Sequence, residues 1–95
     1  MQRRLPPLAS LRAFEAVVRL RSFKAAAAEL NVSSSAISHQ IRRLETELNC
    51  RLMQRNRTGV TLTAQGERYA FGVTRGMERL LEATEELLSD TGQCL

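Results

Sequence analysis

The sequence predicts a mainly α-helical protein with a single small β-hairpin, followed by one long helix. Glycine and proline are scarce, with five and two copies in 95 residues. Apolar residues recur at the three- and four-residue spacing of a helix along most of the chain. Only residues 52–62 depart from this spacing, with a short and partly β-branched pattern. The length allows one small domain, since compact domains usually have roughly 100–150 residues, and it excludes a two-domain enzyme.

The first helix is expected over residues 8–20. Pro6 and Pro7 precede it, and proline presets the backbone for the first turn of a helix. Arg21 and Ser22 interrupt the apolar pattern, so the helix should stop there. Its apolar face combines residues spaced by three or four positions: Leu8, Leu11, Phe14 and Val18.

A short second helix is expected over residues 23–30, with Ser22 as its N-cap. Four successive alanines within it favour a helix and leave little bulk, so that another helix can approach closely. Asn31 tolerates the left-handed backbone that closes a helix. Val32 should plug the following turn with an apolar side chain, and Ser33 should cap a third helix.

The third helix, about residues 33–48, combines a core-facing stripe with a polar and basic outer face. Its apolar residues are spaced by four, three and four positions: Ile37, Ile41, Leu44 and Leu48. The opposite face and its flanks carry small, hydrogen-bonding or basic residues: Ser34, Ser35, Ser38, His39, Gln40, Arg42, Arg43 and Thr46. Such a face suits a helix that reads a groove of duplex DNA.

A small hairpin should follow the third helix. Asn49 is another candidate for a left-handed helix stop, and residues 52–55 and 59–62 favour two short strands. Gly59 can supply a positive φ near the turn. Helix, tight turn, helix and basic hairpin together predict a winged helix-turn-helix, with three helices and a two-stranded wing, over residues 1–62. A plain helical bundle without a ligand is the alternative.

A fourth helix, about residues 64–88, should begin after Thr63 as its cap and continue for roughly 37 Å. Residues 63–95 then form a linker and dimerisation helix, with residues 89–95 as a frayed end or a linker. The helix carries a heptad-like apolar seam with neighbouring leucines: Val73, Met77, Leu80, Leu81, Thr84, Leu87 and Leu88. A lone helix cannot bury this seam, so residues 64–88 are expected to pair with an antiparallel or parallel helix from a second chain. The alternative is a helix that folds back on its own domain.

The GxxxG spacing of Gly72 and Gly76 on this helix resembles a membrane packing motif. Arg75 lies between them, and other charges surround them, so the spacing favours close helix packing in water instead. No stretch approaches the roughly 18 apolar residues that a membrane span needs.

Charge is distributed unevenly along the chain. Residues 1–57 hold eleven basic and four acidic side chains, a net charge of +7, whereas residues 58–95 hold three and six, a net charge of −3. Thirteen of the fourteen basic residues are arginine, whose planar fork suits phosphates and guanine edges. This asymmetry favours a polyanionic partner for the first part, and a merely solvated surface is the alternative.

The sequence argues against an enzyme. It lacks a Gly-rich phosphate loop, paired carboxylates and an activated nucleophile, and His39 is its only histidine, so a His-based metal site is not expected. Cys50 and Cys94 form no CxxC pair, which indicates free thiols in a reducing cytoplasm. Cys50 is expected to be a small buried hydrophobe, with a redox sensor as the alternative. A helical protein-interaction adaptor without DNA binding remains the alternative to a DNA-binding domain.

Three segments resemble the N-terminal domain of LysR-type transcriptional regulators: SFKAAAAELNVS at residues 22–33, AISHQIRRLE at 36–45 and LTAQGE at 62–67. The lead-in, LPPL at 5–8 with LRAFEA at 11–16, is similar to the subgroup of glycine-cleavage and β-lactamase regulators. The resemblance covers residues 5–88. It implies sequence-specific binding of double-stranded DNA by a cytoplasmic, nucleoid-associated bacterial regulator of transcription.

The resemblance also assigns roles by position. The third helix should enter the major groove, and the wing should touch the backbone or minor groove. The implied DNA contacts are Ser33, Ser34, Ser35, Ser38, His39, Arg42, Arg43, Arg55 and Arg57. Ser34 with Ser35, His39, Asn49 and Thr58 depart from the usual family residues, and Arg57 is expected to replace the arginine often found at position 58.

The same resemblance implies a homodimer, a higher oligomer of the full-length protein, and RNA polymerase as a further partner. It implies no cofactor within this chain. A small-molecule effector is expected to bind a separate C-terminal domain that would follow these residues in a longer protein.

Overall fold

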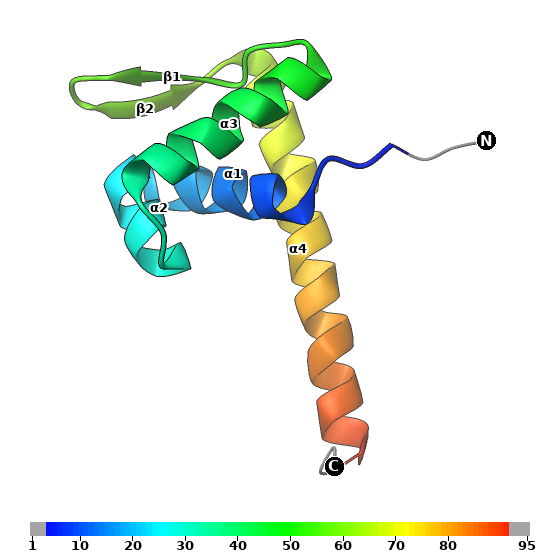
Figure 1. Cartoon of the computed structure of the whole chain (residues 1–95). Coiled ribbons are helices and arrows are strands. Elements are labelled where there is room, and N and C mark those ends of the chain that lie inside the picture. Colours follow the sequence, from blue (N-terminus) through cyan, green and yellow to red (C-terminus); the bar gives the residue numbers. More distant parts are fainter. Residues whose placement is uncertain (1–3, 92–95) are drawn as a thin grey trace.

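Three helices and a two-stranded wing form the head of the molecule, and one long helix projects from it (Figure 1). This computed structural model describes residues 4–91. The elements are α1 (Leu8–Leu20), α2 (Phe23–Leu30), α3 (Ser34–Leu48), β1 (Met53–Asn56), β2 (Gly59–Leu62) and α4 (Ala64–Thr91). The predicted order of three helices, hairpin and long helix is confirmed.

Helix α1 is the central element of the head and packs against α2, α3 and α4. Phe14 and Val17 have no exposed surface, and Val18 packs only partly against the core. Leu8, predicted on the buried face, is instead 54% exposed, because the first turn of α1 borders an open groove beside α4. The buried stripe is therefore rotated slightly from the predicted one.

The turn between α2 and α3 is closed by the backbone. Asn31 adopts the predicted left-handed conformation, and the amide of Val32 donates to the carbonyl of Ala27 at 3.0 Å, which satisfies the end of α2. The prediction that Val32 plugs the turn is wrong, since its side chain is 47% exposed. The buried residues Ala27 and Ile37 lie on either side of the turn. The alanines of α2 allow the close helix contact that the sequence predicted.

The core lies where α1, α3 and the segment before β1 meet. Its largest fully buried apolar side chains are Phe14, Val17, Ile37, Leu44 and Leu52. Burying each of these stabilises the fold by about 1.5–3 kcal/mol relative to leaving it exposed. Ser10 is also fully buried, and its hydroxyl donates to Oε1 of Gln40 at 2.7 Å. This hydrogen bond ties α1 to the third helix across the core.

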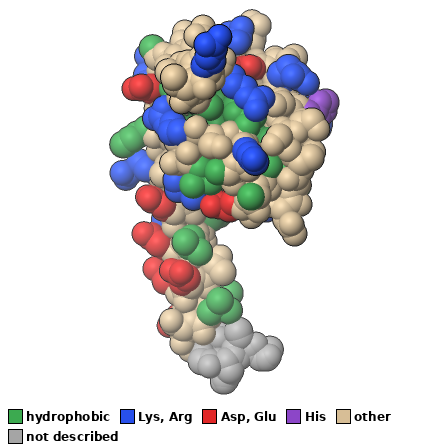
Figure 2. Space-filling view, turned by 90° about the vertical axis from the view of Figure 1, so that its left-hand side faces the viewer, with side chains coloured by type: hydrophobic (Ala, Val, Ile, Leu, Met, Phe, Trp, Pro, Cys, Tyr) green, Lys and Arg blue, Asp and Glu red, His purple; other side chains and the backbone are tan. Residues whose placement is uncertain are grey.

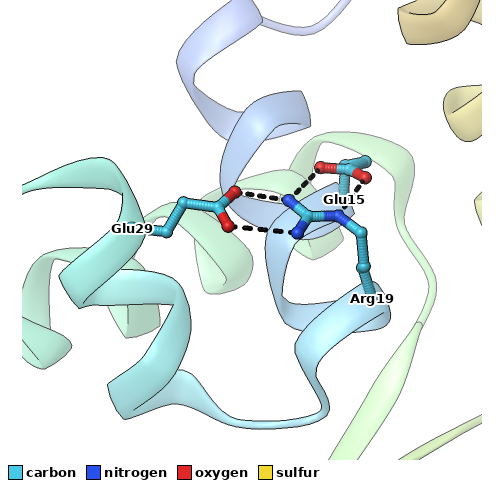
Figure 3. Close-up of polar contacts among 3 residues, drawn as sticks. All are labelled: Glu15, Arg19 and Glu29. Atoms are coloured by element: carbon cyan, nitrogen blue, oxygen red, sulfur yellow. Dashed lines mark hydrogen bonds and ion pairs between the residues drawn. The ribbon is translucent and has the colours of Figure 1, made fainter.

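Arg19 joins α1 to α2 through two carboxylates (Figure 3). Its guanidinium donates to Glu15 one turn earlier, at 2.9 and 3.1 Å, and to both carboxylate oxygens of Glu29 on α2. Hydrogen bonds to Glu29 and Glu15 raise the pKa of Arg19, and the bond from Arg19 lowers the pKa of Glu29. The network therefore favours the charged forms of Arg19 and Glu29.

The wing is a two-stranded antiparallel sheet that pairs Met53 with Leu62 and Asn56 with Gly59. Gly59 has the predicted positive φ, at 136°. The predicted first strand, residues 52–55, is shifted by one residue. Leu52 precedes the strand: its side chain is buried in the core, and its backbone amide donates to Glu45 on α3.

The junction between the wing and α4 is held by Thr63 and Gly66. The Thr63 hydroxyl accepts from the amide of Gly66 at 3.0 Å, as a helix cap does, and donates to the carbonyl of Arg51 at 2.7 Å. A Cβ added at Gly66 would lie 1.9 Å from the carbonyl oxygen of Leu52. Only glycine permits this close approach of α4 to the chain before β1.

Helix α4 is about 42 Å long and leaves the head along most of its length (Figure 1). Ala70 is buried against the head, and the ring of Tyr69 lies 5.7 Å from that of Phe14. Burial raises the pKa of Tyr69, and the negative charge of Glu47 adds to the rise. No helix in the described residues is long and apolar enough to cross a membrane.

The fourth helix was predicted to end near residue 88. This prediction is wrong by three residues, since α4 continues to Thr91. Residues 89–91 therefore belong to α4 and not to a frayed end or linker. The rest of that predicted segment, including Cys94, lies outside the described residues.

Candidate nucleic-acid interface

Helix α3 presents a polar and basic face to solvent. Ile37, Ile41 and Leu44 are buried on its inner side, and Leu48 is partly buried. The outer side carries exposed side chains at four of the predicted contact positions: Ser35, His39, Arg42 and Arg43. Ser34 and Ser38 are half-buried at its edges. The division of this helix into a core face and an outer face is as predicted.

Two serines organise the start of α3. The hydroxyl of Ser33 accepts from the backbone amide of Ala36 at 3.1 Å, which makes Ser33 the N-cap. The hydroxyl oxygens of Ser33 and Ser35 lie 3.2 Å apart and share a hydrogen bond. The predicted contact residue Ser33 therefore has a structural function, and the amides at this helix end favour a phosphate.

Glu45 fixes the start of the wing to α3. Its Oε2 accepts from the backbone amides of Leu52 and Met53 at 2.8 and 3.3 Å, and its Oε1 lies 3.8 Å from Nε of Arg51. Sequence reasoning assigned no function to Glu45. The signal in the sequence was an acidic residue on a helix whose outer face is basic. That signal does not show which backbone amides the carboxylate binds.

The two predicted wing arginines have different surroundings. The guanidinium carbon of Arg55, on β1, lies 4.1 Å from the centre of the Phe23 ring, and its Nη1 donates to the hydroxyl of Ser38 at 3.3 Å. Arg57 is exposed in the turn of the wing, and it has no hydrogen bond or ion pair within residues 4–91. The structure thus brings Arg55 and Ser38 together and leaves Arg57 at the tip.

Arg21 supports the other strand of the wing and was missed by sequence reasoning. It closes α1 in the left-handed conformation, with φ at 55°, and its Nη1 donates to the carbonyl of Val60 at 3.5 Å. The sequence predicted that the helix stops here, but left-handed backbone is uncommon for arginine, and nothing in the sequence indicated the contact with the wing. Glu45 and Arg55 thus hold the wing to α3, and Arg21 holds it to the end of α1.

Basic side chains concentrate around the cleft between α3 and the wing. The cleft has a volume of about 170 Å³, and Ser38, Arg42, Arg51 and Arg55 contribute to its lining. Figure 2 shows the side of the molecule with the wing tip and α2, where Lys and Arg side chains spread over the head and acidic side chains gather on the projecting helix. The asymmetry of charge predicted from the sequence is therefore also spatial.

The apolar seam of α4 divides into a part near the head and a part away from it. Val73 and Met77 pack partly against the core, whereas Leu80 and Leu81 are both 58% exposed. The remaining predicted dimerisation residues are also exposed: Thr84, Leu87 and Leu88. The head covers only the first part of the seam.

An apolar groove of about 430 Å³ runs between α4 and the first turn of α1. Leu8 and Leu11 line one side, and Gly72, Gly76 and Leu80 line the other. A Cβ added at either glycine would meet nothing within 4 Å. The two glycines therefore contact no other helix of the head, and they leave the groove open.

Residues 8–67 match the family model described as bacterial regulatory helix-turn-helix protein, lysR family. The chain belongs to this family. The matched residues run from the start of α1 into the first turn of α4, so the LysR-family match contains the whole head.

Curated relatives of this LysR-family domain are named as transcriptional activators. The glycine cleavage system transcriptional activator homolog of Haemophilus influenzae is 45% identical over 89 residues, which are 94% of this chain and 30% of that protein. The HTH-type transcriptional activator AmpR of Yersinia enterocolitica is 55% identical over 67 residues, 70% of this chain and 23% of that protein. The expected likeness to this subgroup is confirmed. The chain spans less than a third of these relatives' length.

Solved structures share the architecture of this LysR-family domain. A complex named CbnR_DBD-DNA has a TM-score of 0.76 at 28% identity, and the match covers 90% of this chain and 98% of that one. The probable transcriptional regulator PA0477 from Pseudomonas aeruginosa has a TM-score of 0.80 at 36% identity, covering 90% of this chain and 28% of that one. The winged helix-turn-helix followed by a long helix is confirmed as a LysR-type architecture.

Cys50 of this LysR-family domain is a free thiol that is only partly buried. The prediction of a buried cysteine is wrong, because Cys50 follows the left-handed Asn49 in the connection between α3 and the wing and lies beside a surface hollow. No group of three His, Cys, Asp or Glu side chains in the described part of the chain could hold a metal ion.

Proposed function

We propose that this chain is the sequence-specific, double-stranded DNA-binding domain of a dimeric LysR-type transcriptional regulator. One observation carries the proposal. The polar outer face of α3 and the arginine-bearing wing are held beside one another in an architecture shared, at a TM-score of 0.76, with a domain named in a complex with DNA. Family membership supports this function over a helical adaptor, as does that structure.

The recognition helix, about residues 33–48, is proposed to lie in the major groove, which has the width to admit an α-helix. Short serine side chains let the backbone approach the bases, and arginine can bind guanine through two hydrogen bonds. The wing, about residues 52–62, is proposed to touch the backbone or minor groove. The proposed contacts are Ser33, Ser34, Ser35, Ser38, His39, Arg42, Arg43, Arg55 and Arg57.

Selection of bound sites from a random duplex pool tests this proposal, followed by affinity measurements at several salt concentrations. We expect an enriched sequence and an affinity that falls steeply with salt, by about 0.9 in the logarithmic slope for each phosphate contacted. An adaptor would enrich no sequence and would ignore duplex DNA.

The proposed homodimer forms through residues 64–88, with the groove between α1 and α4 occupied by α4 of a second copy. The open glycines Gly72 and Gly76 would let a helix approach closely, and the exposed leucines beyond the head would be covered. A dimer formed through the two α4 helices would place two recognition helices on the same duplex. Sedimentation over a range of protein concentrations tests this assembly.

For the longer regulator we propose a C-terminal domain that binds a small-molecule effector, a higher oligomer, and contact with RNA polymerase. The support is the family membership and the length of the curated relatives, of which this chain spans 23–30%. Binding of candidate effectors to the full-length protein, compared with this chain alone, tests the first of these.

A further inference from the structure

Arg55 is held between two residues of the helix-turn-helix and does not project freely from the wing. Its guanidinium stacks over the ring of Phe23, the first residue of α2, at 4.1 Å. One of its terminal nitrogens donates to the hydroxyl of Ser38 on α3 at 3.3 Å. A cation over an aromatic face is attracted by the ring quadrupole, so this contact helps to fix the guanidinium in place.

The chemistry of the Arg55–Ser38 pair determines the direction of its hydrogen bond. A guanidinium has only donors, so the Ser38 oxygen must be the acceptor, and the hydroxyl proton of Ser38 must point elsewhere. Within the described residues Ser38 donates to no acceptor. By contrast, the Thr84 hydroxyl on α4 donates to the carbonyl of Leu80 at 2.9 Å, one turn earlier. Ser38 therefore keeps its proton available at the half-buried edge of the recognition helix.

We propose that Arg55 is a positioning residue that makes Ser38 a hydrogen-bond donor toward the DNA. The group recognised is a hydrogen-bond acceptor on the duplex, either a base edge such as purine N7 or a phosphate oxygen. This inference rests on the proposed DNA binding. It adds that Arg55 on the wing makes the hydroxyl of Ser38 on the recognition helix the donor, and not the acceptor, in its contact with DNA.

The position of the wing is coupled to this contact. Arg55 lies on β1, and the start of β1 is anchored to α3 by Glu45 through two backbone amides. A shift of the wing would move the guanidinium relative to Ser38 and release the hydroxyl to rotate. A movement of the wing would therefore change the contact that α3 makes with DNA through Ser38.

A double-mutant cycle in the whole chain tests the proposal, with Ser38→Ala and Arg55→Lys as the single changes. Lysine keeps the charge but lacks the planar group that stacks on Phe23. We expect each single change to weaken binding to the selected duplex by about two- to tenfold, the loss of one net hydrogen bond. The double variant should bind no more weakly than the weaker single variant.

Arg57→Lys is the matched control, because Arg57 is an exposed arginine of the same wing without an internal partner in residues 4–91. When Arg57→Lys is combined with Ser38→Ala, the fold-losses in affinity of the two single variants should multiply. The slope of affinity against salt should stay constant for Arg55→Lys, since the charge is kept. Where the acceptor is a base edge, base preference should change at the same site position in Arg55→Lys and in Ser38→Ala, and not in Arg57→Lys; where it is a phosphate oxygen, none of the three variants should change base preference.

Two modified duplexes distinguish the source of the acceptor. Replacing purines by 7-deaza analogues removes N7, and methylphosphonate linkages neutralise single phosphates. A modification that weakens the unmodified protein but not Ser38→Ala identifies the partner of the hydroxyl. If Ser38→Ala responds to every modification as fully as the unmodified protein does, Ser38 donates to neither group, and the proposal is overturned.

Multiplicative effects of Ser38→Ala and Arg55→Lys would likewise overturn the inference while leaving DNA binding intact. Failure of the unmodified chain to bind any duplex would instead refute the proposed function. Thermal melting checks the fold of each variant. Where Arg55→Lys does not fold, Phe23→Leu removes the stacking face from the other side, and its effect should also be non-additive with Ser38→Ala.

Discussion

Side chains from three separate segments fix the wing beside the recognition helix. Glu45 binds the amides before and at the start of β1, Arg55 reaches Ser38, and Arg21 donates to the carbonyl of Val60 on β2. Each contact joins residues 7 to 39 positions apart in the chain. Wing and helix are therefore held as one surface, which limits the orientations in which both can meet a duplex.

Gly66→Ala tests the close approach of α4 to the backbone of Leu52. The new Cβ would lie 1.9 Å from the carbonyl oxygen of Leu52, a backbone atom that cannot move without shifting the start of the wing. We expect a loss of about 1–3 kcal/mol in the free energy of unfolding, from overpacking. Urea denaturation measures it. Gln65→Ala, the exposed neighbour on α4, is the control and should change stability by less than about 0.5 kcal/mol. Equal stability of both variants would contradict the model of a close contact.

Glu29→Gln tests the carboxylate that Arg19 binds across α1 and α2. The folded-state pKa of Glu29 is lowered below the ordinary value of 4.5, mainly by the hydrogen bond from Arg19. The charge of Glu29 therefore adds stability above pH 4.5, and this stability is lost as the pH falls through the lowered pKa. We expect a lower melting temperature for the variant at pH 7, and a difference between the two proteins that shrinks as the pH falls below 4.5 and through the lowered pKa. A difference that stays the same size over this acid range would show that charge is not the cause.

At the scale of elements, the local signals gave correct predictions. Ser22 and Ser33 cap helices, Asn31 and Asn49 close them in the left-handed conformation, and Gly59 has a positive φ. Each of these depends on a residue and its immediate neighbours, which a sequence displays directly. The ends of β1 and α4 shifted by one to three residues: Leu52 lies in the core before the strand, and the exposed last turns of α4 continue beyond the predicted end.

The elements of the candidate site that sequence missed depend on contacts between distant segments. Nothing near Arg55 in the chain indicates that Phe23 and Ser38 surround it, and nothing near Glu45 indicates that it binds the wing backbone. Val32 was predicted to be buried from its apolarity alone, yet the backbone closes the turn without it. The sequence therefore identified the exposed polar and basic face of α3, and the structure was needed to show how the wing is attached to it.

Arg42→Ala tests helix α3 as the element that meets the phosphates. Arg42 is exposed on the outer face and lines the cleft beside the wing. Loss of one phosphate contact should weaken binding to all duplexes alike and reduce the salt slope by about 0.9. Arg79→Ala is the control, because Arg79 lies on the projecting part of α4, 3.7 Å from Glu82. An unchanged slope for Arg42→Ala between low and moderate salt would remove Arg42 from the phosphate contacts.

On the scale of the whole molecule, charge and apolar surface are separated along its length. The head carries most of the arginines, and the projecting helix carries acidic side chains beside exposed leucines (Figure 2). A polyanion is attracted to one end and repelled from the other. In the proposed complex, this separation would orient the molecule on a duplex and would leave α4 for the proposed contact with a second copy.

Leu80→Asp tests that assembly. Leu80 lines the groove and is 58% exposed, so a second α4 would cover it, and an aspartate there would place a charge in an apolar contact. We expect sedimentation to show a monomer at concentrations where the unmodified chain is a dimer, with weaker binding to duplexes that carry two half-sites and unchanged binding to a single half-site. Phe71→Asp is the matched control. Phe71 is 67% exposed, nine residues earlier, and two and a half helical turns place it on the opposite side of α4. A dimer that survives Leu80→Asp, or that is lost equally in Phe71→Asp, would show that the groove face is not the contact between copies.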